Sequence, residues 1–260
     1  MKLMICGKGG SGKSTVSALL AKGMADRGTP VLLVDADESN LGLYRMLGIE
    51  MPRPVLEALG GKKGFQARLK ASAQGFGGPP PLFSGGLTLD TLADDDQIRP
   101  CLAVSGSLKV LTIGKINHFG EGCACPMGNL FRSIFSNLRL TNRDLTIVDT
   151  AAGLEHFGRR LDGECDHILT VIDPSYESVT MAARMAAIAS EAGLPVSGVL
   201  NKTTPELLPE MQAALTDLDI IASLPRDEGL FISTLRGQAL DTGIDGIDLL
   251  CRKIEDLMGI

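Results

Sequence analysis

The chain has 260 residues, of which 44% are apolar and 22% charged, a composition typical of a soluble α/β domain with a sizeable core. Its net charge of −6 argues against nonspecific nucleic-acid binding, because there is no excess of cations to displace phosphate counterions. The sequence has no apolar run long enough to span a membrane and no signal-peptide pattern, so we expect a cytoplasmic protein without a membrane partner. In that compartment the six cysteines favour burial, catalysis or metal binding over disulfides.

A phosphate-binding loop follows the first predicted strand, which covers residues 2–6. Residues 7–14 match the pattern G-x-x-x-x-G-K-[ST], and the segment that follows reads as a helix. The glycines let backbone N–H groups approach an anion, and the dipole of the helix adds positive potential. We expect Lys13 to contact the β- and γ-phosphates of a nucleotide and the Ser14 hydroxyl to bind Mg²⁺. The predicted nucleotide-binding residues of this segment are Gly9, Gly10, Ser11, Gly12, Lys13, Ser14 and Thr15.

A second lysine, Lys8, lies inside the loop. It is either a solvated surface residue or a group that acts on the nucleotide. The second interpretation is favoured, because a cation so close to a polyphosphate is expected to interact with it.

Two further apolar strands, predicted over 30–34 and 144–148, end in carboxylates. Asp35 and Asp37 follow the first strand, and Asp149 follows the second. The carboxyl ends of parallel strands form the ligand-binding edge of an α/β sheet, so these carboxylates can hold Mg²⁺ or orient a water toward the γ-phosphate. Asp149 has the position of a Walker B carboxylate near Mg²⁺. Turn formation or helix capping is the alternative for each of them.

Residues 60–100 are interrupted repeatedly by glycine and proline, and we predict an irregular excursion there. No second domain boundary is evident. We therefore expect one domain over 1–260, a three-layer α/β/α fold with a mostly parallel sheet of seven or eight strands.

A C-x-C pair, Cys123 and Cys125, stands between a strand predicted over 108–114 and a helix that runs to about residue 138. Two thiolates cannot fill a tetrahedral site, but a symmetric dimer would supply four, enough for a soft or borderline metal. Two buried cysteines or a redox pair are the alternatives. Glu155 and His156 follow the Asp149 strand, and their roles stay open because surface histidines are common.

Four segments together resemble the CooC-type nickel-inserting ATPases of the MinD/ParA deviant-Walker-A class. They are Lys8 to Ser14, Asp35-Ala36-Asp37, Cys123-Ala124-Cys125 and Ala152-Gly153-Leu154-Glu155-His156. The resemblance implies an ATP-dependent homodimer in which Lys8 reaches the partner's nucleotide and Asp37, supported by Asp35, positions the attacking water. It also implies that the paired cysteines hold Ni²⁺ or Zn²⁺ between subunits, and that hydrolysis drives nickel insertion into a client such as carbon monoxide dehydrogenase. A MinD/ParA-type positioning ATPase and an iron–sulfur carrier of the same class are the alternatives.

The last third of the chain fits the same fold. Strands are predicted over 168–173, 196–200 and 220–224, and an amphipathic closing helix over 249–258 is expected to pack on the core. As in the class that the chain resembles, Asn201 at a strand end can bond an adenine edge, and the loop from Pro225 can flank the base. A turn cap is the alternative for Asn201.

Overall fold

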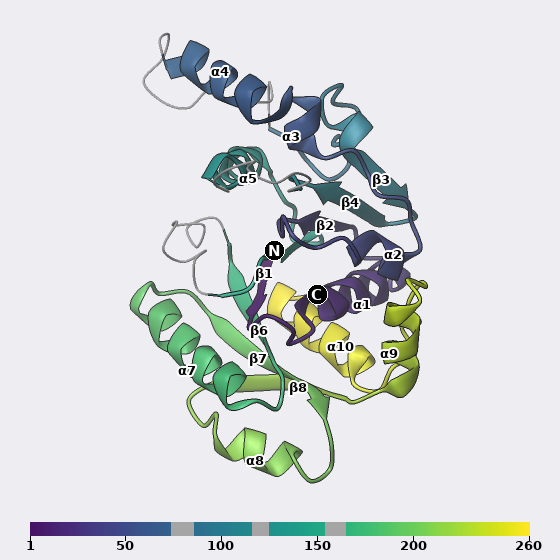
Figure 1. Ribbon diagram of the computed structural model, residues 1–260, viewed down its shortest axis with the longest axis vertical. Coiled ribbons are helices and arrows are strands. Elements are labelled where there is room, and N and C mark those ends of the chain that lie inside the picture. The colour runs from purple at the N-terminus through teal and green to yellow at the C-terminus, as the bar shows by residue number, and fades with distance from the viewer. Residues whose placement is uncertain (74–85, 116–124, 154–164) are drawn as a thin grey trace.

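The computed structural model describes residues 1–73, 86–115, 125–153 and 165–260, and an eight-stranded sheet forms its centre (Figure 1). The strand order is β3-β4-β2-β5-β1-β6-β7-β8. Every neighbouring pair is parallel except β3 and β4, which are antiparallel. The predicted three-layer fold with a mostly parallel sheet is confirmed.

The strands are β1 Lys2–Gly7, β2 Val31–Asp35, β3 Leu102–Ser105, β4 Leu108–Thr112, β5 Leu145–Asp149, β6 His167–Ile172, β7 Val196–Thr203 and β8 Asp219–Pro225. The helices are α1 Lys13–Asp26, α2 Leu43–Leu47, α3 Val55–Ala58, α4 Gly61–Ala73, α5 Cys125–Asn137, α7 Tyr176–Glu191, α8 Leu208–Ala213, α9 Glu228–Leu235 and α10 Ile247–Met258. A short 3₁₀ turn covers Arg99–Cys101.

Both faces of the sheet are covered, and successive residues of each central strand enter opposite cores. In β1, Leu3 and Ile5 belong to the cluster that includes α1, α2 and α10. Met4 and Cys6 belong to the cluster that includes α3, α4, α5 and α7. Figure 1 shows α1 and α10 side by side over one face. Burial on both faces explains why these strands read as continuous apolar runs rather than alternating ones.

The closing helix α10 packs on the core, as predicted. Its apolar side faces α1, where a Cβ built on Gly23 would lie 2.7 Å from Cys251 Sγ. The buried residues of α10 are Ile247, Leu250, Cys251 and Ile254. No helix within the described ranges is long and apolar enough to cross a bilayer.

The prediction of an irregular excursion over 60–100 is wrong for its first part, which forms helix α4. Gly60 and Gly61 have φ of 88° and 69°, so they form the turn that starts the helix instead of interrupting it. Phe65 of α4 is fully buried in the same cluster as Leu92 and Ile98 from the end of the segment. Beyond its glycines the segment is rich in strong helix formers such as Lys, Gln, Arg and Ala, and the burial of Phe65 fixes the helix on the core.

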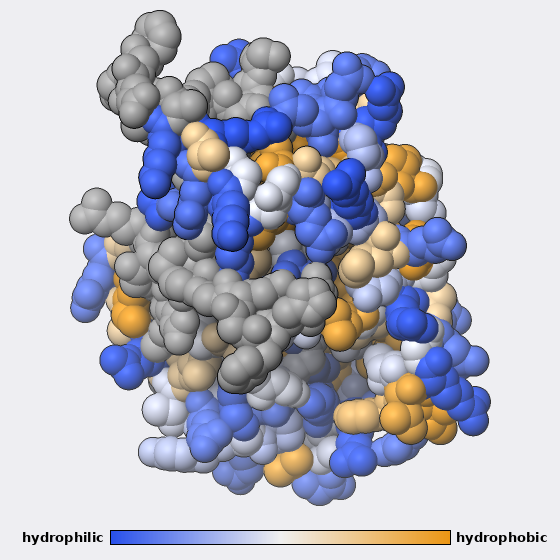
Figure 2. Space-filling model, turned by 45° about the horizontal axis from the view of Figure 1, so that its top comes forward, coloured by the Kyte–Doolittle hydropathy of each residue, from blue (hydrophilic) through white to orange (hydrophobic). Residues whose placement is uncertain are grey.

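Most of the surface seen in Figure 2 is hydrophilic, and outside the grey atoms the hydrophobic residues gather only in small areas. Permanent subunit interfaces are usually large and apolar. On the visible part of this face, an association between chains would therefore depend mainly on polar groups.

Candidate nucleotide-binding site

The topology of the sheet brings the predicted site residues to one edge. β5 lies between β1 and β2, so Asp149 pairs in register with Ile5 on one side and Asp35 on the other. The phosphate-binding loop, residues 7–14, continues directly from β1 to α1. This edge is the carboxyl end of the parallel strands, where α/β sheets bind ligands.

Two side chains at the end of β7 form hydrogen bonds to the phosphate-binding loop. Asn201 Nδ2 donates to the carbonyl oxygen of Ser11 at 2.7 Å, and Lys202 Nζ donates to that of Gly10 at 2.6 Å. Gly10 and Gly12 have φ of 81° and 99°, in the left-handed region that favours glycine. The N–H of Ser11 donates to the carbonyl oxygen of Lys8 at 3.2 Å. With the carbonyl groups of Gly10 and Ser11 drawn toward β7, other N–H groups of the turn and those at the start of α1 can form an anion cradle.

A cavity of about 440 Å³ lies against this loop. The predicted residues that line it are Gly9, Gly10, Gly12, Lys13, Ser14, Thr15, Asp37, Asn201 and Pro225. The lining also includes residues that were not among the predicted binding residues, namely Ser39, Asn40, Met46, Ala152, Lys202, Asp227, Leu230, Phe231 and Thr234. The cavity therefore joins a polar end at the loop to a more apolar end at α9, a division that suits the phosphates and the base of a nucleotide.

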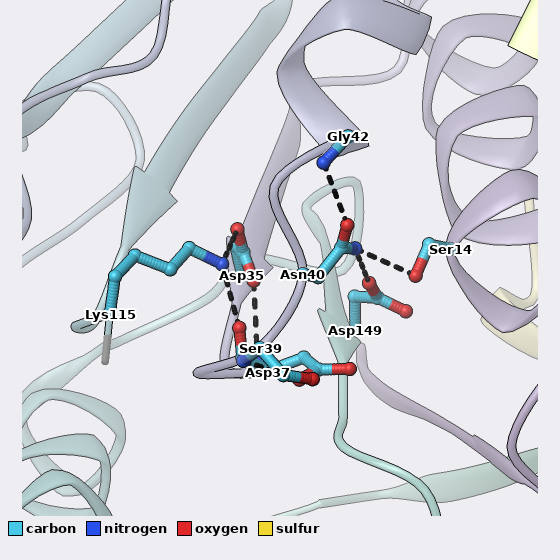
Figure 3. A network of polar contacts seen from close by, with 8 residues as sticks. All are labelled: Ser14, Asp35, Asp37, Ser39, Asn40, Gly42, Lys115 and Asp149. Atoms are coloured by element: carbon cyan, nitrogen blue, oxygen red, sulfur yellow. Dashed lines mark hydrogen bonds and ion pairs between the residues drawn. The ribbon is translucent and has the colours of Figure 1, made fainter. Parts of the chain in front are cut away.

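Ser14 and Asp149, the predicted Mg²⁺ ligands, are brought together by Asn40 (Figure 3). Asn40 Nδ2 donates to Ser14 Oγ at 2.8 Å and to Asp149 Oδ2 at 3.1 Å. Ser17 Oγ donates to the other oxygen of Asp149 at 3.1 Å. Burial raises the pKa of Asp149, while hydrogen bonds with Ser14 and Ser17 act against this rise. Hydroxyl and carboxylate oxygens are hard ligands that fit Mg²⁺, and a bound cation would keep Asp149 ionised.

Asp35 has a partner that the sequence analysis did not foresee. Its Oδ2 lies 2.6 Å from Lys115 Nζ, and both side chains are 1% exposed. Burial raises the pKa of Asp35 to about 7, although Lys115 opposes the rise. Because this carboxylate is engaged by the ammonium and does not appear among the described lining of the cavity, its arrangement does not support the predicted role as a Mg²⁺ ligand. The sequence did contain one indication of this pair: Lys115 stands three residues beyond β4, at the same edge of the sheet as the two aspartates.

Asp37 lies at the cavity, as a residue that positions water should. Its Oδ1 accepts hydrogen bonds from the backbone N–H of Ser39 at 2.9 Å and from Ser39 Oγ at 2.7 Å. This local turn fixes the carboxylate without using both of its oxygens. The role of Asp37 toward the attacking water remains a prediction.

The two loop lysines lie in different surroundings. Lys13 is 6% exposed and lines the cavity, where its Nζ donates to the carbonyl oxygen of Lys8 at 3.2 Å. Burial lowers the pKa of Lys13, and the nearby Asp149 opposes that shift. Lys8 Nζ lies 3.3 Å from Ser175 Oγ and 3.2 Å from Glu177 Oε2, near the start of α7. Within one chain, Lys8 therefore contacts α7, and its action on a partner's nucleotide stays a prediction.

Most of the predicted C-x-C metal site lies outside the residues that the structure describes. Cys123, Glu155 and His156 lie outside the described residues, and Cys125 is the first residue of α5. Elsewhere, within 1–73, 86–115, 125–153 and 165–260, no group of three or more His, Cys, Asp or Glu side chains is arranged to hold a metal ion. The C-x-C site therefore stays a prediction.

The parallel sheet, the loop between β1 and α1, and the oxygen ligands beside it define a P-loop ATPase that takes ATP with Mg²⁺. The chain belongs to the CobQ/CobB/MinD/ParA nucleotide binding domain family, whose model matches residues 3–240.

Individual relatives cover nearly the whole chain. An uncharacterized ATP-binding protein of Methanocaldococcus jannaschii is 39% identical and aligns with 95% of this chain and 96% of its own. The carbon monoxide dehydrogenase accessory protein CooC of Rhodospirillum rubrum is 30% identical over 88% of this chain and 85% of its own. The septum site-determining protein MinD of Pyrococcus horikoshii, solved with Mg-ADP, has the same fold with a TM-score of 0.65 at 19% identity, covering 99% and 97% of the two chains.

Replacing Phe231 with alanine should weaken ATP binding. The ring lines the α9 end of the cavity, and the charged groups of Lys202 and Arg226 lie 5.9 Å and 5.4 Å from its centroid. Loss of an aromatic contact with a base costs about 1–3 kcal/mol, so we expect KM for ATP to rise roughly 5- to 150-fold with kcat preserved. Steady-state kinetics measure this. Leu235→Ala, on the same helix at 87% exposure, is the control and should leave KM unchanged, and an unchanged KM in Phe231→Ala would place the base elsewhere.

Proposed function

We propose that this ATPase forms a nucleotide-dependent homodimer, binds Ni²⁺ or Zn²⁺ through Cys123 and Cys125 from both subunits, and uses hydrolysis to deliver the metal to a client enzyme. The relative named as a carbon monoxide dehydrogenase accessory protein, similar over most of its length, supports such a client. So does the C-x-C pair, because four thiolates from two chains complete a metal site that two cannot.

The observation that carries the proposal is the contact of Lys115 with the nucleotide site, because Lys115 stands only a few residues before the cysteines in the sequence. Lys115, which follows β4, donates to the carbonyl oxygen of Asp37 at 2.6 Å, and Asp37 lines the nucleotide cavity. The segment that begins at Lys115 continues to Cys123 and Cys125 and then enters α5. A change at the nucleotide therefore has a short covalent route to the cysteines.

The catalytic roles follow from the positions of the side chains. Lys13 and the loop N–H groups hold the phosphates, while Ser14 and Asp149 hold Mg²⁺, which neutralises charge on the transferring phosphoryl group. Asp37 orients the attacking water. The partner's copy of Lys8 stabilises the developing charge, so hydrolysis is slow in a single chain.

The test is metal stoichiometry in the Cys123→Ser, Cys125→Ser double variant. The wild-type chain, purified with a non-hydrolysable ATP analogue and loaded with Ni²⁺ or Zn²⁺, should retain about one ion per pair of chains, as expected for four thiolates around one tetrahedral ion. The double variant should retain none above background while binding ATP as tightly as wild type. Elemental analysis after gel filtration measures the metal, and titration calorimetry measures the nucleotide.

Cys101→Ala is the matched control, because Cys101 is fully buried in the core and should not affect metal content. Full metal retention in the double variant would refute the site. A chain that stays monomeric by light scattering with saturating ATP and metal would refute the dimer. A visible absorption band near 400 nm after anaerobic purification would favour the iron–sulfur alternative.

A further inference from the structure

Lys115 carries a buried charge to which the catalytic roles above assign no task. Its side chain and that of Asp35 are each 1% exposed, and the ammonium lies 2.6 Å from the carboxylate. Lys115 follows β4 and Asp35 ends β2, which are neighbouring strands in the sheet. The pair therefore lies at the same edge as the phosphate-binding loop.

The ion pair holds the main chain of Asp37 at two points. Lys115 Nζ donates to the carbonyl oxygen of Asp37 at 2.6 Å, and the N–H of Asp37 donates to Asp35 Oδ1 at 3.3 Å. Figure 3 shows Lys115 and Asp35 pointing toward one another beside Asp37, with the contacts among Ser14, Asn40 and Asp149 next to them. Two buried side chains thus fix the backbone of a residue that lines the cavity.

Stability alone does not explain such a pair. Taking two charges out of water costs about as much as their attraction returns, and apolar pairs of similar volume are often at least as stable. A buried ion pair can instead fix the positions of the atoms that it contacts, since hydrogen bonds to charged groups add geometric specificity. The atoms fixed here belong to Asp37.

We propose that Lys115 is a positioning residue for ATP hydrolysis: its ammonium, anchored by Asp35, fixes the Asp37 backbone so that the Asp37 carboxylate is presented to the nucleotide. Lys115 is not among the described residues that line the cavity, so it acts through Asp37 and not on the substrate. The inference rests on the proposed role of Asp37 toward the attacking water. It is independent of metal delivery by the cysteines.

Lys115→Met tests the inference, because it removes the charge and keeps a side chain of similar length. We expect kcat to fall about 10- to 100-fold with KM and Kd for ATP within about threefold of wild type, since misplacement of a reacting group affects the chemical step more than ground-state binding. Lys115→Arg keeps the charge and should restore part of kcat. Lys109→Met, on β4 itself, is the matched control and should keep the wild-type kcat.

The Lys115→Met, Asp35→Asn double variant covers the case in which the single variant does not fold, because it removes both buried charges. The kcat of this double variant should fall by about the same factor as that of Lys115→Met. Asp37→Asn is assayed beside it. Loss of kcat in Asp37→Asn together with wild-type kcat in a folded Lys115→Met or double variant overturns the inference. Wild-type kcat in Asp37→Asn instead overturns the role of Asp37, and with it the basis for this positioning.

Discussion

Lys8→Ala should lower kcat for ATP hydrolysis about 100-fold or more and leave Kd for ATP within about threefold of wild type, since a cation supplied from a partner acts mainly in the transition state. Within its own chain, the Lys8 ammonium contacts Ser175 and Glu177. Removing it therefore leaves the residues that line the cavity in place. Single-turnover kinetics and equilibrium titration of ATP separate the two effects.

A mixing experiment decides whether Lys8 acts across the interface. Neither Lys8→Ala nor Asp37→Asn is expected to be active alone. In a mixed dimer, one site has an intact Asp37 and receives Lys8 from the other subunit. Equal mixing should thus restore roughly a quarter of wild-type activity, since about half of the dimers are mixed and one of their two sites is complete. If Lys8 acted within its own chain, mixing would restore nothing.

Glu177→Gln is the companion variant, because it removes the charge that pairs with Lys8 at 3.2 Å. Glu177 has a side chain that is 75% exposed, so the pair contributes little to stability and its loss should not affect folding. ATP turnover should be equal to wild type or higher, since Lys8 is then free to reach a partner. A fall in turnover similar to that of Lys8→Ala would indicate that the Glu177 contact itself is part of the active arrangement.

The features that sequence predicted well are local. The loop 7–14 has a fixed spacing, and the central strands are buried on both faces, so their apolar runs stand out. The topology then placed Asp37 and Asp149 near the loop, as expected for neighbouring strand ends.

What sequence missed depends on contacts between distant segments. β3 is half exposed at the sheet edge, and its apolar run of Leu102, Ala103 and Val104 is too short to mark it as a strand. α4 is held by Phe65 in a core completed by residues far along the chain. The partner of Asp35 is Lys115, which lies beyond the end of β4, and no spacing rule links two residues so far apart in the chain. No sequence pattern predicted that Asn40 joins Ser14 to Asp149.

Gly12→Ala should abolish measurable ATP binding, with Kd rising about 100-fold or more, because the loop N–H groups can no longer converge on the phosphates. Gly12 has φ of 99°, and a Cβ built there would lie 2.2 Å from Asn201 Nδ2. Asn201 would have to move, which would break its 2.7 Å hydrogen bond to the buried loop residue Ser11. Fluorescence titration with a labelled ATP analogue measures the affinity, and urea unfolding measures the free energy of unfolding.

Gly28→Ala separates backbone strain from the clash. Gly28 follows the other end of α1 with φ of 87°, it is exposed, and a Cβ there would meet no atom within 4 Å. Both variants place alanine in the left-handed region, which costs about 1–2 kcal/mol, so Gly28→Ala should lose that much stability and keep its ATP affinity. Gly12→Ala should lose a further 1–3 kcal/mol or so for the broken buried hydrogen bond.

The clash makes a further, non-additive prediction. In the Gly12→Ala, Asn201→Ala double variant the clash with the Asn201 amide is removed and only the backbone strain remains, so part of the lost affinity should return although two site residues are now altered. Additive losses would instead mean that strain at residue 12, and not its contact with β7, disables the loop. Recovery would show that the end of β7 sets the shape of the phosphate-binding loop. Asn201, nearly two hundred positions away in the chain, would then determine whether the loop can bind ATP.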